Sequence, residues 1–219
     1  MKNVIVSPSV LGATLTNLGD EIKRMKSVNI KWIHFDVMDG EFVKNVSFGP
    51  LFLNKVCPEI DLVKDVHLMI ANPLEKVEEY ANCGADYLTF HYEACNDDAE
   101  VFKVIDKIHS FGIKAGISIK PKTPIEKIFP FLHSLDLVLI MSVEPGYGGQ
   151  RFIDLSLNKI GFLKSKINEE NVNVLISVDG GVNDKTAKDC IAVGVDILVV
   201  GQYLFEKEDY IERYNRLFK

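Results

Sequence analysis

Short apolar runs alternate with amphipathic stretches along the whole chain. Between the runs, segments such as 17–28 and 72–84 carry apolar residues three and four positions apart, which is typical of a helix with one buried face. Eight runs rich in β-branched residues predict buried β-strands. These runs cover residues 4–9, 32–38, 62–69, 86–91, 113–119, 137–143, 172–179 and 196–201.

This alternation predicts an α/β fold. Eight strand and helix units in 219 residues fit a single (β/α)8 barrel of the TIM type, because helical crossovers make successive strands parallel. The phrase GADYL at residue 84 returns as GVDIL at residue 194, half a chain later, which indicates a weak internal repeat. We therefore expect one barrel domain over 1–219, with an open doubly wound sheet as the alternative.

Composition narrows the classes of function. The hydrophobic fraction of 47% and the charged fraction of 26% are those of a globular protein. A net charge of -6 argues against a nucleic-acid partner. The four cysteines lack C-x-x-C spacing and no signal sequence begins the chain, so we expect a cytoplasmic protein without disulfides. The longest apolar run, LDLVLIMSV, is too short to cross a membrane.

The motif HFDVMDG places charges inside a predicted buried strand. Because side chains alternate along a strand, His34, Asp36 and Met38 share one face. The third predicted strand repeats the pattern in DVHLM at 65–69, and Asp179 ends the seventh. Buried charges without partners cost several kcal/mol. Repetition at the same end of three strands therefore favours a joint site over separately satisfied polar groups.

Two imidazoles and two carboxylates at one point form a set of metal ligands. Nitrogen and oxygen donors without thiolate suit Zn, Fe(II), Mn or Co. We expect one such divalent ion, held by His34, Asp36, His67 and Asp179. Three methionines near the same strand ends are either ordinary core residues or an apolar shell that excludes water from the site. They are Met38, Met69 and Met141.

Glycine-bearing loops follow the last three predicted strands. Their sequences are EPGYGGQRF, DGG and GQ. Glycine lets backbone N–H groups point together into a concavity that binds an anion. In this type of barrel the phosphate site lies at the same loops. A metal site beside a phosphate site indicates a small phosphorylated sugar as the substrate.

Several motifs, in order and spacing, resemble those of the ribulose-phosphate 3-epimerase family. They are SPSVL, HFDVMDGEFVKNVSFGP, DVHLMI, FHYE, GISIKPKTP, LIMSVEPGYGGQRFI, VDGGV and GVDILVVGQYLF, and they span nearly the whole chain. The resemblance implies a ribulose-phosphate-binding barrel and a metal-dependent isomerase of the pentose phosphate pathway. This isomerase would interconvert D-ribulose 5-phosphate and D-xylulose 5-phosphate by inverting C3. Asp36 and Asp179 would move the proton through a metal-stabilised enediolate.

The resemblance also implies the substrate contacts. Ser9 and His67 would touch the substrate. Apart from the resemblance, we interpret His91 with Glu93 as partners that support the ligands from behind. The phosphate would be held by Gly146, Tyr147, Gly148, Gly149, Gly180, Gly181, Gly201 and Gln202.

Four questions stay open at this stage. Gln202 and Tyr203 stand where the family usually has a small residue after the glycine, so a longer ketose phosphate such as allulose 6-phosphate is an alternative substrate. A decarboxylase or aldolase would call for a catalytic lysine, which the charged motifs lack. A non-catalytic sugar-phosphate sensor would not need both aspartates. Assembly into a homo-oligomer is left open.

Overall fold

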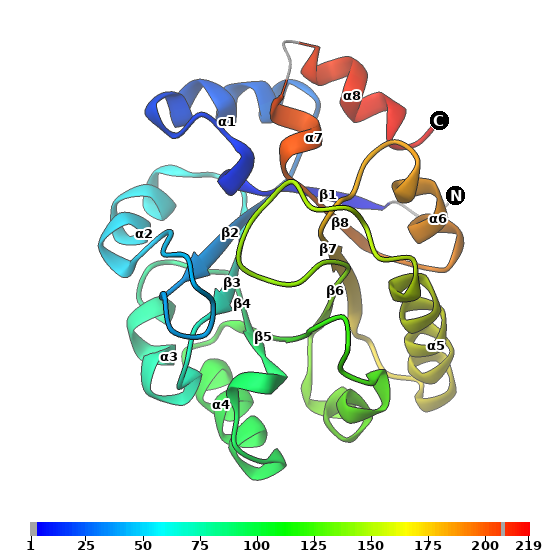
Figure 1. The fold of residues 1–219 in the computed structure, drawn as a ribbon. Helices are drawn as coiled ribbons and strands as arrows, with labels where there is room; N and C mark the ends of the chain where they lie inside the picture. The colour runs from blue at the N-terminus through cyan, green and yellow to red at the C-terminus, as the bar shows by residue number, and fades with distance from the viewer. Residues whose placement is uncertain (1–3, 207–208) are drawn as a thin grey trace.

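The computed structural model describes residues 4–206 and 209–219, in which eight parallel strands form one sheet that curls into a barrel (Figure 1). The strands are β1 (Ile5–Pro8), β2 (Trp32–Met38), β3 (Val63–Met69), β4 (Tyr87–His91), β5 (Lys114–Ile119), β6 (Leu137–Met141), β7 (Leu175–Asp179) and β8 (Ile197–Val200). Their spatial order is sequential, from β2 through β8 to β1. The predicted (β/α)8 barrel is confirmed, and the doubly wound alternative is wrong.

Helices cover the outside of the barrel (Figure 1). They are α1 (Leu18–Ser27), α2 (Pro50–Val56), α3 (Pro73–Ala81), α4 (Asp98–Ser110), α5 (Leu155–Glu170), α6 (Thr186–Ala192), α7 (Gln202–Phe205) and α8 (Tyr210–Arg216). Five 3-10 segments complete the connections: η1 (Val10–Gly12), η2 (Leu15–Asn17), η3 (Cys57–Glu59), η4 (Tyr92–Ala94) and η5 (Ile125–Ser134). Across the described ranges, every helix is too short or too polar to span a bilayer.

The two faces of β2 lie in different surroundings. Ile33, Phe35 and Val37 are fully buried in the main core cluster, which helix residues also join. His34 and Asp36 are buried on the opposite face and make polar contacts with one another. The alternation predicted from the sequence is confirmed, because a strand directs successive side chains to opposite faces.

The register between β2 and β3 brings polar side chains together. His34 is the partner of Asp65, Asp36 of His67, and Met38 of Met69. β1 forms a regular ladder with β8, whereas its pairing with β2 in the described chain is a single bridge between Ser9 and His34. The barrel is therefore closed at the level of the predicted site.

Every strand except β2 is one to three residues shorter than the apolar run that predicts it, and β6 and β7 are examples. β6 ends at Met141, and the Ser142 hydroxyl that follows donates to the carbonyl oxygens of Asp179 and Gly180, at 2.7 and 2.6 Å. Before β7, the Val172 amide still donates to the end of α5, at 3.2 Å from Ile167 O. Both apolar ends therefore belong to connections that pack against the barrel.

Candidate active site

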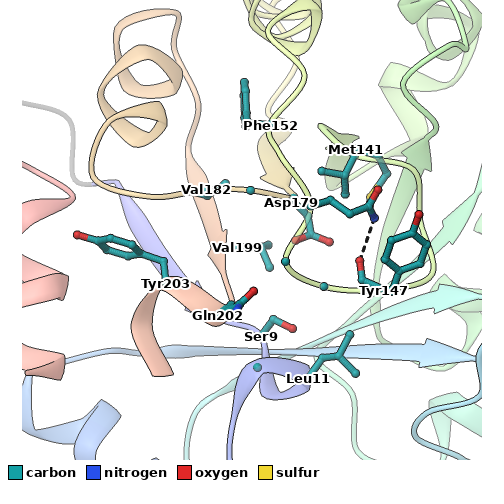
Figure 2. A pocket seen from close by; sticks show the side chains of 18 of the residues that line it. Ser9, Leu11, Met141, Tyr147, Phe152, Asp179, Val182, Val199, Gln202 and Tyr203 are labelled. Carbon is teal, nitrogen blue, oxygen red and sulfur yellow. Dashed lines mark hydrogen bonds between the residues drawn. The ribbon is translucent and has the colours of Figure 1, made fainter. Parts of the chain in front are cut away.

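A cavity of about 850 Å³ opens at the carboxyl ends of the strands (Figure 2). It lies between the first turns of the chain and the connections that follow β6, β7 and β8. Most residues predicted for the site line it, namely Ser9, Asp36, Met38, Met69, Met141, Gly146, Tyr147, Gly148, Gly149, Asp179, Gly180, Gly181, Gly201 and Gln202. His34 and His67 are fully buried and lie against Asp36.

Four predicted ligands converge at this cavity. His34, Asp36, His67 and Asp179 each offer one ligand atom, and these atoms all lie within 4.8 Å of one another. The Oδ1 atom of Asp36 is 3.3 Å from His34 Nε2 and 3.2 Å from His67 Nδ1. Its Oδ2 atom accepts a hydrogen bond of 2.5 Å from the Ser9 hydroxyl. Three separate strands therefore supply one compact set of nitrogen and oxygen donors.

The charges of this cluster are only partly balanced. Burial disfavours the ionised form of Asp36, but His34 and His67 outweigh this effect and lower the pKa of Asp36. Burial likewise opposes the charged form of His34, yet Asp36 and Asp65 hold its pKa well above the usual range. Burial and the neighbouring Asp36 raise the pKa of Asp179 to about 7.

This imbalance fits a cation. Asp36 and Asp179 repel one another when both are ionised, and His34 with the Gly180 backbone offsets only part of that repulsion. A divalent ion would neutralise both carboxylates. Two imidazoles and two carboxylates are suitable ligands for Zn, Fe(II), Mn or Co.

Each histidine of the cluster has a second partner on its other nitrogen. His34 Nδ1 lies 2.8 Å from Asp65 Oδ2. His67 Nε2 lies 2.9 Å from His91 Nε2, and His91 Nδ1 is 3.2 Å from Glu93 Oε2. The supporting position expected for His91 and Glu93 agrees with these contacts. The partnership of Asp65 with His34 was not predicted, although strand parity had placed Asp65 on the correct face.

The connection after β6 crosses the mouth of the barrel in Figure 1 and carries the first glycine motif. Gln150 Nε2 donates to the carbonyl oxygens of Glu144 and Tyr147, at 2.7 and 2.9 Å, the second of these being drawn in Figure 2. Gly181 adopts a φ of +63°, and a Cβ atom there would lie 2.5 Å from Phe152 N. Only glycine therefore lets the connections after β6 and β7 meet so closely.

The start of α7 forms another wall of the cavity. Gln202 Nε2 donates to Glu206 Oε1 at 2.6 Å, and a Cβ atom on Gly149 would lie 2.5 Å from Gln202 Oε1. Ser9 packs against this turn, because a Cβ atom on Gly201 would lie 3.7 Å from Ser9 Cβ. Two cations that sequence reasoning missed, Arg151 and Lys185, also line the cavity. The signal for Arg151 was its place in the motif EPGYGGQRF.

A family model and individual relatives match nearly the whole chain and indicate the same family. A family model described as "Ribulose-phosphate 3 epimerase family" matches residues 5–205. The chain is 43% identical over 205 residues to ribulose-phosphate 3-epimerase of Bacillus subtilis (strain 168), covering 93% of each protein. It is 42% identical over 210 residues to the chloroplastic ribulose-5-phosphate-3-epimerase of Arabidopsis thaliana, covering 96% of this chain and 74% of that protein.

Solved structures with little sequence similarity share the fold. The 3-hexulose-6-phosphate synthase from Salmonella typhimurium superimposes with a TM-score of 0.70 at 14% identity, covering 98% of this chain and 96% of that one. The 3-keto-L-gulonate-6-phosphate decarboxylase from Vibrio cholerae gives a TM-score of 0.71 at 12% identity, covering 99% and 96%. At such identities the similarity is evidence for the barrel alone.

Proposed function

The chain belongs to the ribulose-phosphate 3-epimerase family, and from this premise we propose that it inverts C3 of D-ribulose 5-phosphate to give D-xylulose 5-phosphate. The observation that carries the proposal is the convergence of His34, Asp36, His67 and Asp179 within 4.8 Å beside a cavity walled by glycine-rich connections. Such an arrangement combines two groups for proton transfer with a place for a phosphate.

We propose that His34, Asp36, His67 and Asp179 hold one divalent ion, which is Zn, Fe(II), Mn or Co. Their donor chemistry and the unbalanced charge of Asp179 support this assignment. When bound, the ion would supply positive charge that stabilises the negative charge developing as a proton leaves C3. Met38, Met69 and Met141 line the same cavity and would limit the access of water.

Asp36 and Asp179 would divide the proton transfers. Inversion needs one group to remove the C3 proton from one side and another to return a proton to the other side. In the metal-free chain the pKa of Asp36 is lowered while that of Asp179 is raised to about 7. Each positioned acid or base contributes roughly 10²- to 10⁴-fold to the rate of proton transfer. The Ser9 hydroxyl, bonded to Asp36, would orient that carboxylate.

The phosphate of the substrate would lie against the glycine-rich connections. Gly146, Tyr147, Gly148, Gly149, Gly180, Gly181, Gly201 and Gln202 all line that side of the cavity. Arg151 and Lys185 add positive charge there. Remote binding of this kind positions C3 between the carboxylates. A longer ketose phosphate is the second candidate substrate, because a cavity of about 850 Å³ leaves room for another carbon.

The test uses two variants in deuterated water. Asp179→Asn removes one base, so epimerisation should collapse while one epimer still slowly exchanges its C3 hydrogen. Asp36→Asn should retain exchange of the other epimer only. The metal content of each variant is measured in parallel, and Asp106→Asn on the exposed side of α4 is the control. Near-normal inversion by metal-replete Asp179→Asn, or equal exchange of both epimers, would contradict the two-base scheme.

The remaining expectations concern the whole chain. We propose that 1–219 acts as one barrel domain, which the single barrel formed by the described residues supports. Residues 1–3 and 207–208 of that range lie outside the described residues. A cytoplasmic location and assembly into a homo-oligomer stay sequence-based expectations. Assays with five-, six- and seven-carbon ketose phosphates would decide the substrate.

A further inference from the structure

The two nitrogens of His67 have different neighbours. Nδ1 lies 3.2 Å from Asp36 Oδ1, on the side of the ligand cluster. Nε2 points away from the cluster and lies 2.9 Å from His91 Nε2. Both rings are fully buried, so each ring nitrogen depends on protein groups for its hydrogen bond.

This geometry determines where the protons lie when His67 binds an ion. The ligand atom Nδ1 must present a lone pair, so the proton of the neutral ring is on Nε2. That N–H donates to His91 Nε2, which leaves the proton of His91 on Nδ1. His91 Nδ1–H then donates to Glu93 Oε2, at 3.2 Å. The chain of donors runs in one direction and ends on a carboxylate.

The far end of this chain is firmly attached. Glu93 Oε1 accepts from the Lys120 amide at 2.7 Å and from the Thr123 hydroxyl. The segment 120–123 is held in turn by Lys159 of α5, whose ammonium donates to the carbonyl oxygens of Lys120, Pro121 and Thr123, at 3.1, 2.7 and 2.6 Å. Glu93 is therefore fixed by two donors from a segment that α5 itself holds.

Packing also fixes the ring of His91. The Phe42 ring lies against it with centroids 4.8 Å apart and a tilt of 41°. The ammonium of Lys120 lies 4.0 Å from the centroid of the Phe42 ring, a cation–π contact that helps to hold that ring in place. His91 thus has little freedom to turn, and its two nitrogens keep their partners.

We propose that His91 and Glu93 are positioning residues that set the proton of His67 on Nε2 and leave Nδ1 free to bind the ion. The proposal rests on the proposed metal site. Asp65 serves His34 in the opposite sense, since it occupies Nδ1 and leaves Nε2 facing Asp36. The two histidine ligands would therefore use different nitrogens. Partners of this kind alter metal affinity by about 10- to 100-fold when they are removed.

The unmodified protein provides the first test. ¹⁵N-labelled wild type is loaded with Zn²⁺, and long-range ¹H–¹⁵N correlations report which nitrogen of each histidine carries a proton. We expect a proton on Nε2 of His67, on Nδ1 of His91 and on Nδ1 of His34. A proton on Nδ1 of His67, or on Nε2 of His91, would overturn the proposal.

Variants of His91 provide the second test, read as Zn²⁺ affinity in competition with a chromophoric chelator. His91→Phe keeps a ring but removes the acceptor, so the dissociation constant should rise about 10-fold or more. His91→Gln restores an acceptor oxygen and should recover part of that loss. If His91 only filled space, Phe would be the milder substitution, and that ranking would overturn the proposal. His133→Gln, at an exposed histidine, is the control.

Glu93→Gln tests the end of the chain. An amide has one acceptor and one donor, whereas Glu93 accepts on both oxygens. Either orientation of the amide places its donor against another N–H group, of His91 or of Lys120. We expect weaker Zn²⁺ binding, and unchanged affinity in the folded variant would overturn the proposal. Wild type that binds no Zn²⁺ would overturn the proposed metal site. Normal binding by wild type and by the variants would overturn only the positioning role of His91 and Glu93.

Discussion

Asp179→Asn should stabilise the metal-free protein while it abolishes catalysis. Asp179 and Asp36 present ligand atoms no more than 4.8 Å apart, and two unit charges at that distance repel by ~3 kcal/mol at an effective dielectric constant of about 20. Burial, and next to it the charge of Asp36, raise the pKa of Asp179 from 3.8 to about 7, which corresponds to about 4 kcal/mol. Because Asp179 is only partly buried, solvent weakens this effect, and we expect a gain of ~2 kcal/mol in the free energy of unfolding.

The sign of the pH dependence follows from the direction of this shift. Asp179 has a raised pKa in the folded chain, so between about pH 4 and pH 7 the folded state holds a proton that the unfolded state has lost. Metal-free wild type therefore gains stability from this group as the pH falls through that range. The asparagine variant has no such gain. Its advantage should be full above about pH 7 and should disappear near pH 4.

Urea unfolding followed by circular dichroism measures this difference, with chelator-treated wild type and variant compared at several pH values. Adding Zn²⁺ should reverse the order, because an ion present at about 100 times its dissociation constant stabilises the wild type by ~2.7 kcal/mol and the variant by less. Asp106→Asn is the control for removal of an exposed carboxylate. An advantage that is absent, or that does not change with pH, would show that burial and Asp36 do not disfavour the ionised form of Asp179.

Three further predictions address the ion, the phosphate and the segment after β5. Gently purified protein should contain close to one divalent ion per chain, and chelation should abolish an activity that Zn, Mn, Co or Fe(II) restores; full activity without metal would contradict the assignment. Unphosphorylated ribulose should have a kcat/KM at least ~10³-fold below that of the phosphate ester, and comparable values would exclude a phosphate site. Lys159→Met removes three hydrogen bonds to carbonyl oxygens that are buried or partly buried, so urea unfolding should reveal a loss of ~2 kcal/mol, and an unchanged midpoint would contradict this role.

The metal ligands could be predicted because their signal is local. Alternation within β2 is sufficient to place His34 and Asp36 on one face, since a strand has a side-chain period of two. The pairing of His34 with Asp65 depends instead on the register between β2 and β3. That register is determined by how the whole barrel packs, so strand parity could identify the face of Asp65 and not its partner.

Lys159 shows a different limit. Its position within α5 resembles any lysine on an amphipathic helix, yet its ammonium is buried among backbone oxygens 36 to 39 residues earlier in the chain. Carbonyl oxygens are present at every residue and leave no mark in the sequence. The role of Arg151 was missed for a related reason, because glycine motifs predict where an anion binds without indicating which side chains accompany them.

The single bridge between Ser9 and His34 has a consequence for how substitutions are interpreted. Every other neighbouring pair of strands in the described barrel shares a ladder of at least three residue pairs, whereas β1 and β2 are paired only through this bridge. Ser9 and His34 of the proposed active site therefore also close the β-barrel. Loss of turnover after replacing Ser9 or His34 would combine the loss of a catalytic or binding group with a weaker pairing of β1 and β2. Amide hydrogen exchange would separate the two effects, because a substitution that affects only the chemistry leaves the backbone amides of β1 and β2 protected from exchange.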